Sequence, residues 1–428
     1  METTKKKGQA QKWITLILMM MSMGTIYVLP YMKGMFFTPL QEAMGLMDDT
    51  TAYGTLTSVY GIMNLICYLP SGIIADKFDA KKLLVFSMIS TGVLGLYMST
   101  WPGYDMLLII HILFGVTTVL TFWSSSVKVV NMLAASDEQG QMFGFLEGGR
   151  GILGIALNTI LLALFAFASS KVDDVEGVTW VVVAVSVYMI LIGVALGFLL
   201  PKGQKGESTN TSFKDSLIAM GHAFKQPITW CISGIIFCCC CMTTTGSYFA
   251  PYLEGGCAMA VVMTSTFQMI RGNGAQIIAA PVAGSISKKM GRSSGVTMAA
   301  CLGLAAVSAI LFVVPASPAL LFPIMGLMLL FSYCYSSNRA VYWALIDEAG
   351  TPKNMVGSVT GIASLIGFLP DTFLNTVYGS IIDNNSFEAA YNKIFMFCTI
   401  VAVIGLCFAI YANKIVKKHQ AEAKAAAA

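Results

Sequence analysis

The chain carries very little charge for its length. Of its 428 residues, 22 are Asp or Glu and 26 are Lys or Arg, which together make up 11%. Soluble domains carry roughly 25% charged residues, whereas 56% of this chain is hydrophobic. This composition indicates a protein that crosses a membrane several times, and we expect no nucleic-acid partner.

Histidine is scarce too, and motifs that hold nucleotides or metals are missing from the sequence. The three His and eleven Cys, including the cysteine run 238–241, show no metal-ligand spacing. Cysteine in hydrocarbon behaves as a small apolar residue. There is no glycine-rich phosphate loop, and no polar stretch is long enough for an ATPase domain. We therefore expect no metal, no cofactor, no enzymatic activity and no transport driven directly by ATP.

Apolar runs of about 20 residues or more, long enough to cross about 30 Å of hydrocarbon, occur twelve times. They predict an all-α membrane protein with transmembrane helices at 13–41, 52–74, 82–101, 104–133, 141–168, 177–200, 227–253, 258–283, 293–314, 318–345, 355–380 and 390–413. A polar stretch divides six helices from six. The predicted domains are an N-terminal bundle at 1–200, a cytoplasmic linker at 201–226, a C-terminal bundle at 227–413 and a cytoplasmic tail at 414–428.

Lysine and arginine cluster in alternate loops. Nineteen of the 26 fall in the loops on one side, and the opposite loops hold only Lys171 and Lys393. Because loops rich in Lys and Arg stay in the cytoplasm, we expect both termini to be cytoplasmic in a multi-pass protein of the bacterial inner membrane.

The two halves repeat each other. The loop from Gly72 through Asp76 to Lys77, between the second and third spans, has a counterpart at 284–292 between the eighth and ninth. Lys128 in the fourth span and Arg339 in the tenth follow similar serine-containing stretches. Repeated six-helix halves predict a substrate site at their interface, near the bilayer midplane.

With this helix count, the central basic loop and the Gly-x-x-x-Asp-Lys sequence of Gly72, Asp76 and Lys77, the chain resembles the major facilitator superfamily over nearly its whole length. The resemblance implies the major facilitator fold of two pseudo-symmetric halves. It also implies that the Gly72 loop controls a gate. The family usually has glycine at the position of Asp79.

Within that superfamily, the chain is similar to the organophosphate:phosphate antiporters and to sugar-acid porters. By this resemblance, Lys33 lies where the family has a phosphate-binding Arg, Lys128 at another family Arg position, and Arg150 at the position of a substrate-linked His. The family's partner Arg in the seventh span is missing, since its place falls near Met242. Arg271 in the eighth span could supply the second charge.

Seven side chains that are charged at neutral pH lie within the predicted spans and away from their ends, and five of them are cationic. They are Lys33, Lys128, Arg150, Arg271, Arg339, Glu147 and Asp371. A charge at mid-bilayer costs about 2.5 to 3.5 kcal/mol on insertion scales, so such residues usually line a cavity, a relay or a partner. The excess of positive charge predicts a pathway for an anion.

Lys33, Arg150 and Arg271 are the cations that we expect to bind substrate. Lys33 follows Pro30, so its helix should be irregular there; snorkelling to the interface is the alternative. Arg271 lies 13 residues before Gly284, roughly 20 Å from the predicted cytoplasmic end. It therefore lines a cavity or packs against another helix.

Glu147 and Arg150 lie three residues apart, on one helix face. They form either a structural ion pair or a switchable pair in which Arg150 leaves Glu147 to grip an anion. Tyr27 and Tyr31 lie near the predicted cations. They are expected either to pack or to stack on a sugar-like substrate.

Glu147 and Asp371 are the predicted coupling or counter-ion carboxylates, because a buried carboxyl group can carry a proton. Asp371 could equally be the structural partner of a basic residue. Lys128 and Arg339 lie near the predicted cytoplasmic ends of their spans and are assigned, with Gly72, Asp76 and Lys77, to the gate. They would pair with an acidic residue or snorkel, and the acidic candidates are Asp76, Asp137, Asp347 and Glu348.

The sequence thus predicts a monomeric secondary transporter that works by alternating access. Its expected substrate is a small phosphorylated, sulfonated or carboxylated compound, sugar-like or short-chain. Protons or a counter-anion would drive transport, and membrane lipid is the other partner. Two alternatives stay open. One is a multidrug or lysolipid exporter whose charges serve only the gates, and the other is a non-transporting sensor, which usually needs an added signalling domain.

Overall fold

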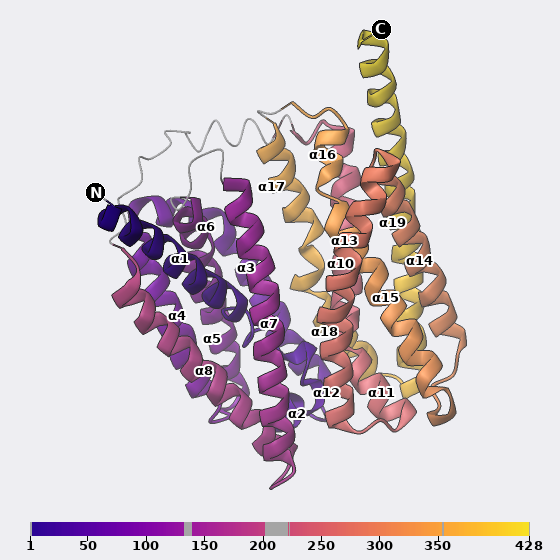
Figure 1. Cartoon of the computed structure of the whole chain (residues 1–428). Helices are drawn as coiled ribbons and strands as arrows, with labels where there is room; N and C mark the ends of the chain where they lie inside the picture. Colours follow the sequence, from indigo (N-terminus) through magenta and orange to yellow (C-terminus); the bar gives the residue numbers. More distant parts are fainter. Residues whose placement is uncertain (1, 132–138, 202–220, 222, 353–354, 428) are drawn as a thin grey trace. The chain divides into compact units, whose positions relative to one another are not determined.

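The computed structural model describes residues 2–131, 139–201, 221, 223–352 and 355–427, and every regular element in these ranges is helical (Figure 1). The first elements are α1 (Glu2–Thr25), η1 (Met32–Gly34), α2 (Phe37–Ala43), α3 (Thr50–Lys77), α4 (Ala80–Met98), α5 (Tyr104–Gly115), η2 (Val116–Trp123), α6 (Ser124–Asn131), α7 (Gln139–Ser169) and α8 (Asp174–Leu199). The others are α10 (Pro227–Ser247), α11 (Phe249–Cys257), α12 (Val261–Met269), η3 (Ile270–Gly274), α13 (Ala275–Met290), α14 (Ser294–Val313), η4 (Pro318–Leu320), α15 (Leu321–Val341), α16 (Ala344–Glu348), α17 (Val356–Gly367), η5 (Leu369–Thr372), α18 (Leu374–Asp383) and α19 (Phe387–Ala427).

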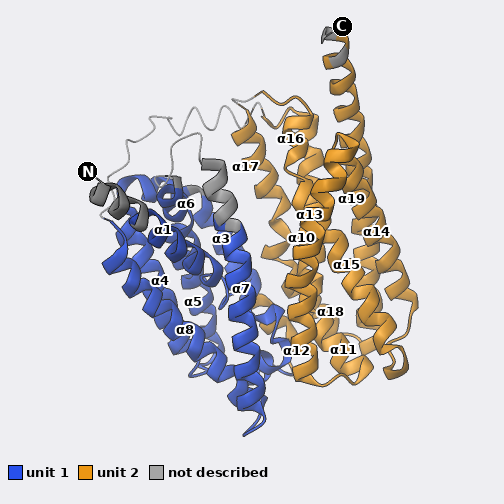
Figure 2. Cartoon of the chain, in the orientation of Figure 1, with its two compact units in different colours: residues 1–47, 56–209 blue, residues 48–55, 210–428 orange. Residues whose placement is uncertain are grey.

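The chain divides into two compact units (Figure 2). Unit 1 contains residues 1–47 and 56–209, and unit 2 contains residues 48–55 and 210–428. The helix α3 is therefore shared, because its first residues belong to unit 2 and the rest to unit 1.

The helical elements of the described residues confirm the predicted all-α fold class, and twelve spans are consistent with them. Within the described residues, nine helices are long and apolar enough to cross a membrane, or ten when the bent α3 is included. The two spans outside this count are 13–41 and 258–283. The second contains the polar turn η3, which lowers its hydropathy.

Two helix boundaries differ from the predicted ones. The single helix expected at 13–41 was wrong, because α1 ends at Thr25 and the chain runs through turns and η1 before α2 begins. Pro30 explains part of this break, since proline lacks the N–H that a continuing helix needs. At the other end, α19 continues as a helix through most of the stretch predicted to be a tail.

Besides the first span, three spans contain a π-helical or 3-10 turn within their length. The elements η2 and η3 are π-helical turns inside the fourth and eighth spans, and η5 is a 3-10 turn between α17 and α18. Such turns are frequent at functional sites because they change the direction of side chains and free backbone carbonyls. Arg271 lies in η3 and Asp371 in η5, so the predicted charges coincide with two of the three interruptions.

In unit 1, α4 and α8 pack closely through glycines. A Cβ atom built on Gly92 would lie 2.6 Å from the carbonyl oxygen of Ser186, and one built on Gly193 would lie 2.7 Å from Cγ1 of Ile89. Lipid tails are as apolar as the surface of a neighbouring membrane helix, so burial of apolar surface does not drive two such helices together. Close packing of this kind does.

Replacing Gly193 by alanine should therefore destabilise the protein by about 1 to 3 kcal/mol, because the new methyl group overpacks the α4–α8 contact. Thermal melting of the purified protein measures this. Gly154→Ala on α7 is the matched control, since a Cβ there would have no neighbour within 4 Å among the described residues. Equal melting temperatures for the two variants would contradict the proposed packing.

Candidate functional site

Four tyrosines of unit 1 gather where α1 ends, beside α3 and η2. The rings of Tyr31 and Tyr60 meet edge to face, with centroids 5.3 Å apart. The hydroxyl groups of Tyr60 and Thr118 are hydrogen-bonded at 3.0 Å, and the Tyr27 hydroxyl donates to the Thr118 carbonyl at 3.4 Å. The Tyr68 hydroxyl acts electrostatically on that of Tyr27. We call Tyr27, Tyr31, Tyr60 and Tyr68 the tyrosine cluster.

Helix α3 contributes Tyr60 and Tyr68 to this cluster. Asn64 lies between them on the same helix, so the three residues are spaced four apart. The Asn64 amide nitrogen donates to the Tyr31 hydroxyl at 3.5 Å, and the Asn64 carbonyl oxygen is buried without a hydrogen-bond partner among the described residues. Such orphaned oxygens are uncommon, and a ligand hydroxyl group could satisfy this one. None of these three residues was among the predicted site residues, although their spacing of four places them on one helix face.

Arg150 on α7 brings a positive charge to the tyrosine cluster. Its Cγ would lie 3.6 Å from a Cβ atom built on Gly24, so its stem packs against α1, and its charge acts on the Tyr27 hydroxyl. Arg150 is half-buried. The side chain of Glu147 lies outside the described residues, so the predicted Glu147–Arg150 pair stays a prediction.

Lys33 is placed among η1, α2 and α5. Only 6% of its surface is exposed, and its ammonium group lies 5.0 Å from the centre of the Phe37 ring. Its charge also acts on His111 of α5, whose Nδ1 lies 2.8 Å from the Leu107 carbonyl. The burial of Lys33 argues for a fixed internal charge rather than a snorkelling one.

Arg271 is 5% exposed and is held by neutral groups of unit 2. Its guanidinium donates to Gln268 at 2.7 Å, to the Ser332 hydroxyl at 2.8 Å and to the Gly246 carbonyl at 3.0 Å, and it lies 5.3 Å from the Phe249 ring centre. Within the described part of the chain, no carboxylate forms an ion pair with it. This geometry is the one expected of packing against neighbouring helices, and substrate binding by Arg271 stays a prediction.

Asp371 is half-buried and bound to α10. One oxygen of its carboxylate accepts from the Cys240 thiol at 3.4 Å and from the Thr244 hydroxyl at 3.1 Å. The charge of Arg339 on α15 acts on it, although no ion pair joins the two among the described residues. Asp371 therefore has partners on α10 that were not predicted from the sequence. Its role in coupling stays a prediction.

The predicted gate residues Asp76 and Lys128 lie together. The Lys128 ammonium donates to the Ala75 carbonyl at 2.7 Å and lies 3.9 Å from the Asp76 carboxylate. Lys77 is exposed, and a Cβ atom on Gly72 would meet nothing within 4 Å among the described residues. Lys128 is thus paired with Asp76, one of the four acidic candidates. The function of the gate stays a prediction.

Of the other acidic candidates, Glu348 is engaged elsewhere, Asp347 is exposed and Asp137 lies outside the described residues. Both oxygens of Glu348 accept from the backbone N–H of Ser293, at 2.7 and 2.9 Å, at the start of α14. Arg339 is exposed. Asp79, where the family usually has glycine, accepts from the N–H of Lys81 at 2.8 Å and so caps α4.

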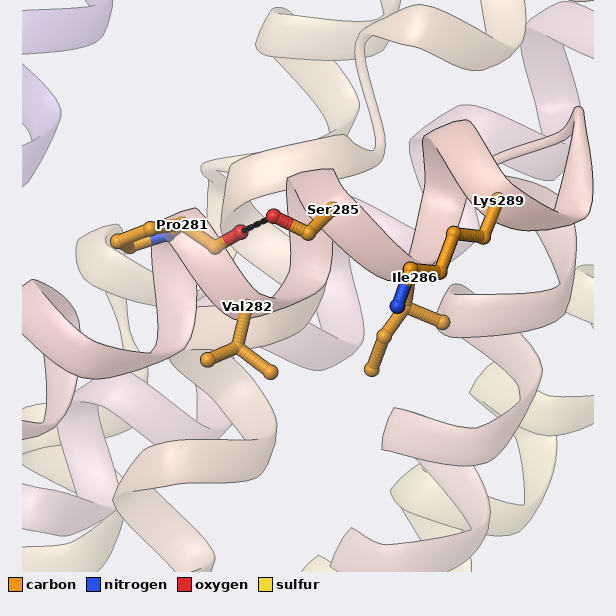
Figure 3. Close-up of a pocket in the computed structure, with 5 residues that line it drawn as sticks. All are labelled: Pro281, Val282, Ser285, Ile286 and Lys289. Carbon is orange, nitrogen blue, oxygen red and sulfur yellow. Dashed lines mark hydrogen bonds between the residues drawn. The ribbon is translucent and has the colours of Figure 1, made fainter.

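A groove of about 300 Å³ runs along α13, lined by Pro281, Val282, Ser285, Ile286 and Lys289 (Figure 3). The Ser285 hydroxyl donates to the Pro281 carbonyl, so its hydrogen bond is satisfied within the helix. The groove contains none of the predicted site residues.

Comparisons with known proteins agree with this architecture. The sequence model described as Major Facilitator Superfamily matches residues 13–373. Inner membrane protein YqcE of Escherichia coli K12 is 32% identical over 391 residues, covering 90% of this chain and 91% of that protein. Inner membrane protein YihN of the same organism is 28% identical over 422 residues, covering 98% and 99%.

Two transporter structures share the fold. A bacterial homologue of the human lysosomal transporter Spinster, inward-facing and unoccupied, has a TM-score of 0.70 at 15% identity and covers 95% of this chain and 98% of its own. The nucleoside transporter NupG has a TM-score of 0.68 at 13% identity and covers 96% and 99%. At such identities the likeness concerns the fold alone.

Arg271→Gln should destabilise the protein by about 2 kcal/mol, because hydrogen bonds from a charged donor are lost in a buried site. Thermal melting without any ligand measures this. Lys288→Gln, which changes an exposed lysine of α13, is the control, since exposed substitutions usually change stability by less than about 0.5 kcal/mol. A wild-type melting temperature for Arg271→Gln would show that the observed bonds do not stabilise unit 2.

Proposed function

Since this chain belongs to the major facilitator superfamily and is a multi-pass membrane transporter, we propose that its substrate is a small organic anion with hydroxyl groups. The anionic group would be a phosphate, a sulfonate or a carboxylate on a sugar-like or short-chain compound. Transport would proceed by alternating access. The two relatives from Escherichia coli are named inner membrane proteins, which supports the same location for this chain.

The observation that carries this proposal is the position of Arg150 beside the tyrosine cluster. A guanidinium group binds phosphate, sulfonate or carboxylate oxygens through paired N–H donors. Phenol hydroxyl groups and the orphaned Asn64 oxygen can exchange hydrogen bonds with the hydroxyl groups of a sugar-like body. Both parts of the proposed ligand therefore have matching groups in unit 1.

Two further buried cations favour an anion over a cation. Lys33 in unit 1 and Arg271 in unit 2 keep positive charge away from water, where it is screened less than at a surface. For coupling, Asp371 is the proposed proton-binding group, because its hydrogen bonds with Cys240 and Thr244 converge on one oxygen. Exchange for a second anion is the other mode, and it would need no proton on Asp371.

Thermal stabilisation by a panel of phosphorylated, sulfonated and carboxylated sugars and short organic acids tests the proposal. A ligand that binds only the folded protein adds about 2.7 kcal/mol of stability at a concentration of 100 times Kd. Arg150→Gln should weaken binding at least about tenfold, since it removes charge-assisted hydrogen bonds. Arg292→Gln, which changes an arginine after the end of α13, should bind as the wild type does.

The results separate the competing functions. Stabilisation by one anion class that is lost in Arg150→Gln supports the proposal. Equal stabilisation of the wild type and Arg150→Gln would remove Arg150 from the site. Stabilisation by lipophilic cations or lysolipids, with none by anions, would identify an exporter instead.

A further inference from the structure

Helix α13 of unit 2 is buried along one narrow face. Its buried residues are Ala275, Ala279 and Ala283, which lie four residues apart and so follow one side of the helix. The last of them packs against Val296 of α14 and Val341 of α15. Most of the residues between these alanines are exposed. The described part of unit 2 therefore leaves a wide face of α13 open.

The groove along α13 lies on this open face, and most of its lining is apolar (Figure 3). The side chains of Val282 and Ile286 project to the same side of the helix in that view. Ser285 is small, and its hydroxyl is bonded to the Pro281 carbonyl. A Cβ atom built on Gly284 would meet nothing within 4 Å among the described residues. Since the hydrocarbon region of a bilayer holds no water, a hydrocarbon chain is the natural occupant of such a groove.

Three cations stand at one end of the groove. Lys288 and Lys289 lie in the last turn of α13, and Arg292 follows the Gly291 cap directly. Lys289 also lines the groove. Within the described ranges, none of the three cations takes part in an ion pair. The Nε atom of Arg292 is buried and has no hydrogen-bond partner there.

The groups of the chain that reach this end of α13 do not neutralise the cations. Glu348 uses both carboxylate oxygens to accept from the backbone N–H of Ser293, at 2.7 and 2.9 Å. From α19, the neutral amide of Gln420 donates to the Gly291 carbonyl at 2.9 Å. The positive charge beside the groove is therefore available to an anion from outside the chain.

We propose that the α13 groove binds one anionic phospholipid, with an acyl chain along Val282 and Ile286 and the phosphate against Lys289 and Arg292. The distribution of lysine and arginine predicts that this end of α13 is cytoplasmic. Clusters of Lys and Arg on that side of a membrane attract anionic headgroups. A zwitterionic lipid carries an ammonium group of its own, which these cations repel. The site lies in unit 2, and it goes beyond the proposed substrate and does not depend on it.

Native mass spectrometry of the delipidated full chain in detergent tests this site. The protein would be titrated with dioleoyl phosphatidylglycerol or with dioleoyl phosphatidylethanolamine. These lipids have the same acyl chains, so the comparison isolates the charge of the headgroup. The first phosphatidylglycerol should bind at least about fivefold more tightly than the first phosphatidylethanolamine, because each Lys or Arg beside an anionic headgroup strengthens binding by about that factor.

Three variants locate the lipid. Lys289→Gln removes a cation that lines the groove and should weaken phosphatidylglycerol binding about fivefold. Lys288→Gln is the matched control, since Lys288 is the exposed neighbour that does not line the groove. Its charge acts only at longer range, where it is screened, so binding should change less than about twofold. Ser285→Leu fills the groove without changing its charge and should weaken the binding of both lipids.

Equal binding of the two lipids by the wild type would overturn the proposal. Equal losses in Lys289→Gln and Lys288→Gln would overturn it as well, since a diffuse surface charge would then attract the lipid. Wild-type binding by Ser285→Leu, at a wild-type melting temperature, would show that no acyl chain lies in the groove. Because no substrate anion is added and Arg150 is unchanged, these outcomes are separate from the test of the proposed substrate class.

Discussion

The cost of placing charge inside a membrane is the constraint on which the rest of this structure depends. A lone charge in hydrocarbon is strongly unfavourable, so each one must find partners or water. Arg271 finds them in neutral groups, namely Gln268, Ser332 and the Gly246 carbonyl. Asp371 does so in the Cys240 thiol and the Thr244 hydroxyl.

Irregular backbone makes these arrangements possible. The Gly246 carbonyl accepts from both Gln268 and Arg271 and lies one residue before the end of α10, where carbonyls have no partner within the helix. Arg271 itself lies in the π-helical turn η3. The glycine also leaves room for the guanidinium, because a Cβ atom at position 246 would lie 2.7 Å from it. In unit 2 the irregular backbone therefore provides the hydrogen-bond acceptor that the buried charge needs.

The fold could be predicted from the sequence because it follows from the length of the apolar spans and from the repeat of the two halves. The first span was the exception, since its composition is apolar throughout and the break after Thr25 depends on local turns near Pro30. The charged residues of the candidate site could also be found, because charge is rare in such a chain. Their partners could not, since Cys240 and Asp371 meet only through tertiary packing.

Tyr60, Asn64 and Tyr68 were missed for a different reason. Placing an uncharged residue in a membrane costs little free energy, so such residues are not conspicuous in the sequence. Only their regular spacing indicates that they share a helix face.

Uptake into proteoliposomes tests the central claim most directly, namely that this transporter moves an organic anion held by Arg150. The labelled anion that best stabilises the folded protein would be offered to vesicles containing the wild type or Arg150→Gln, with equal amounts of folded protein. The account predicts uptake by the wild type and its loss in Arg150→Gln. Equal uptake by both, or uptake of a lipophilic cation in place of every anion, would contradict it.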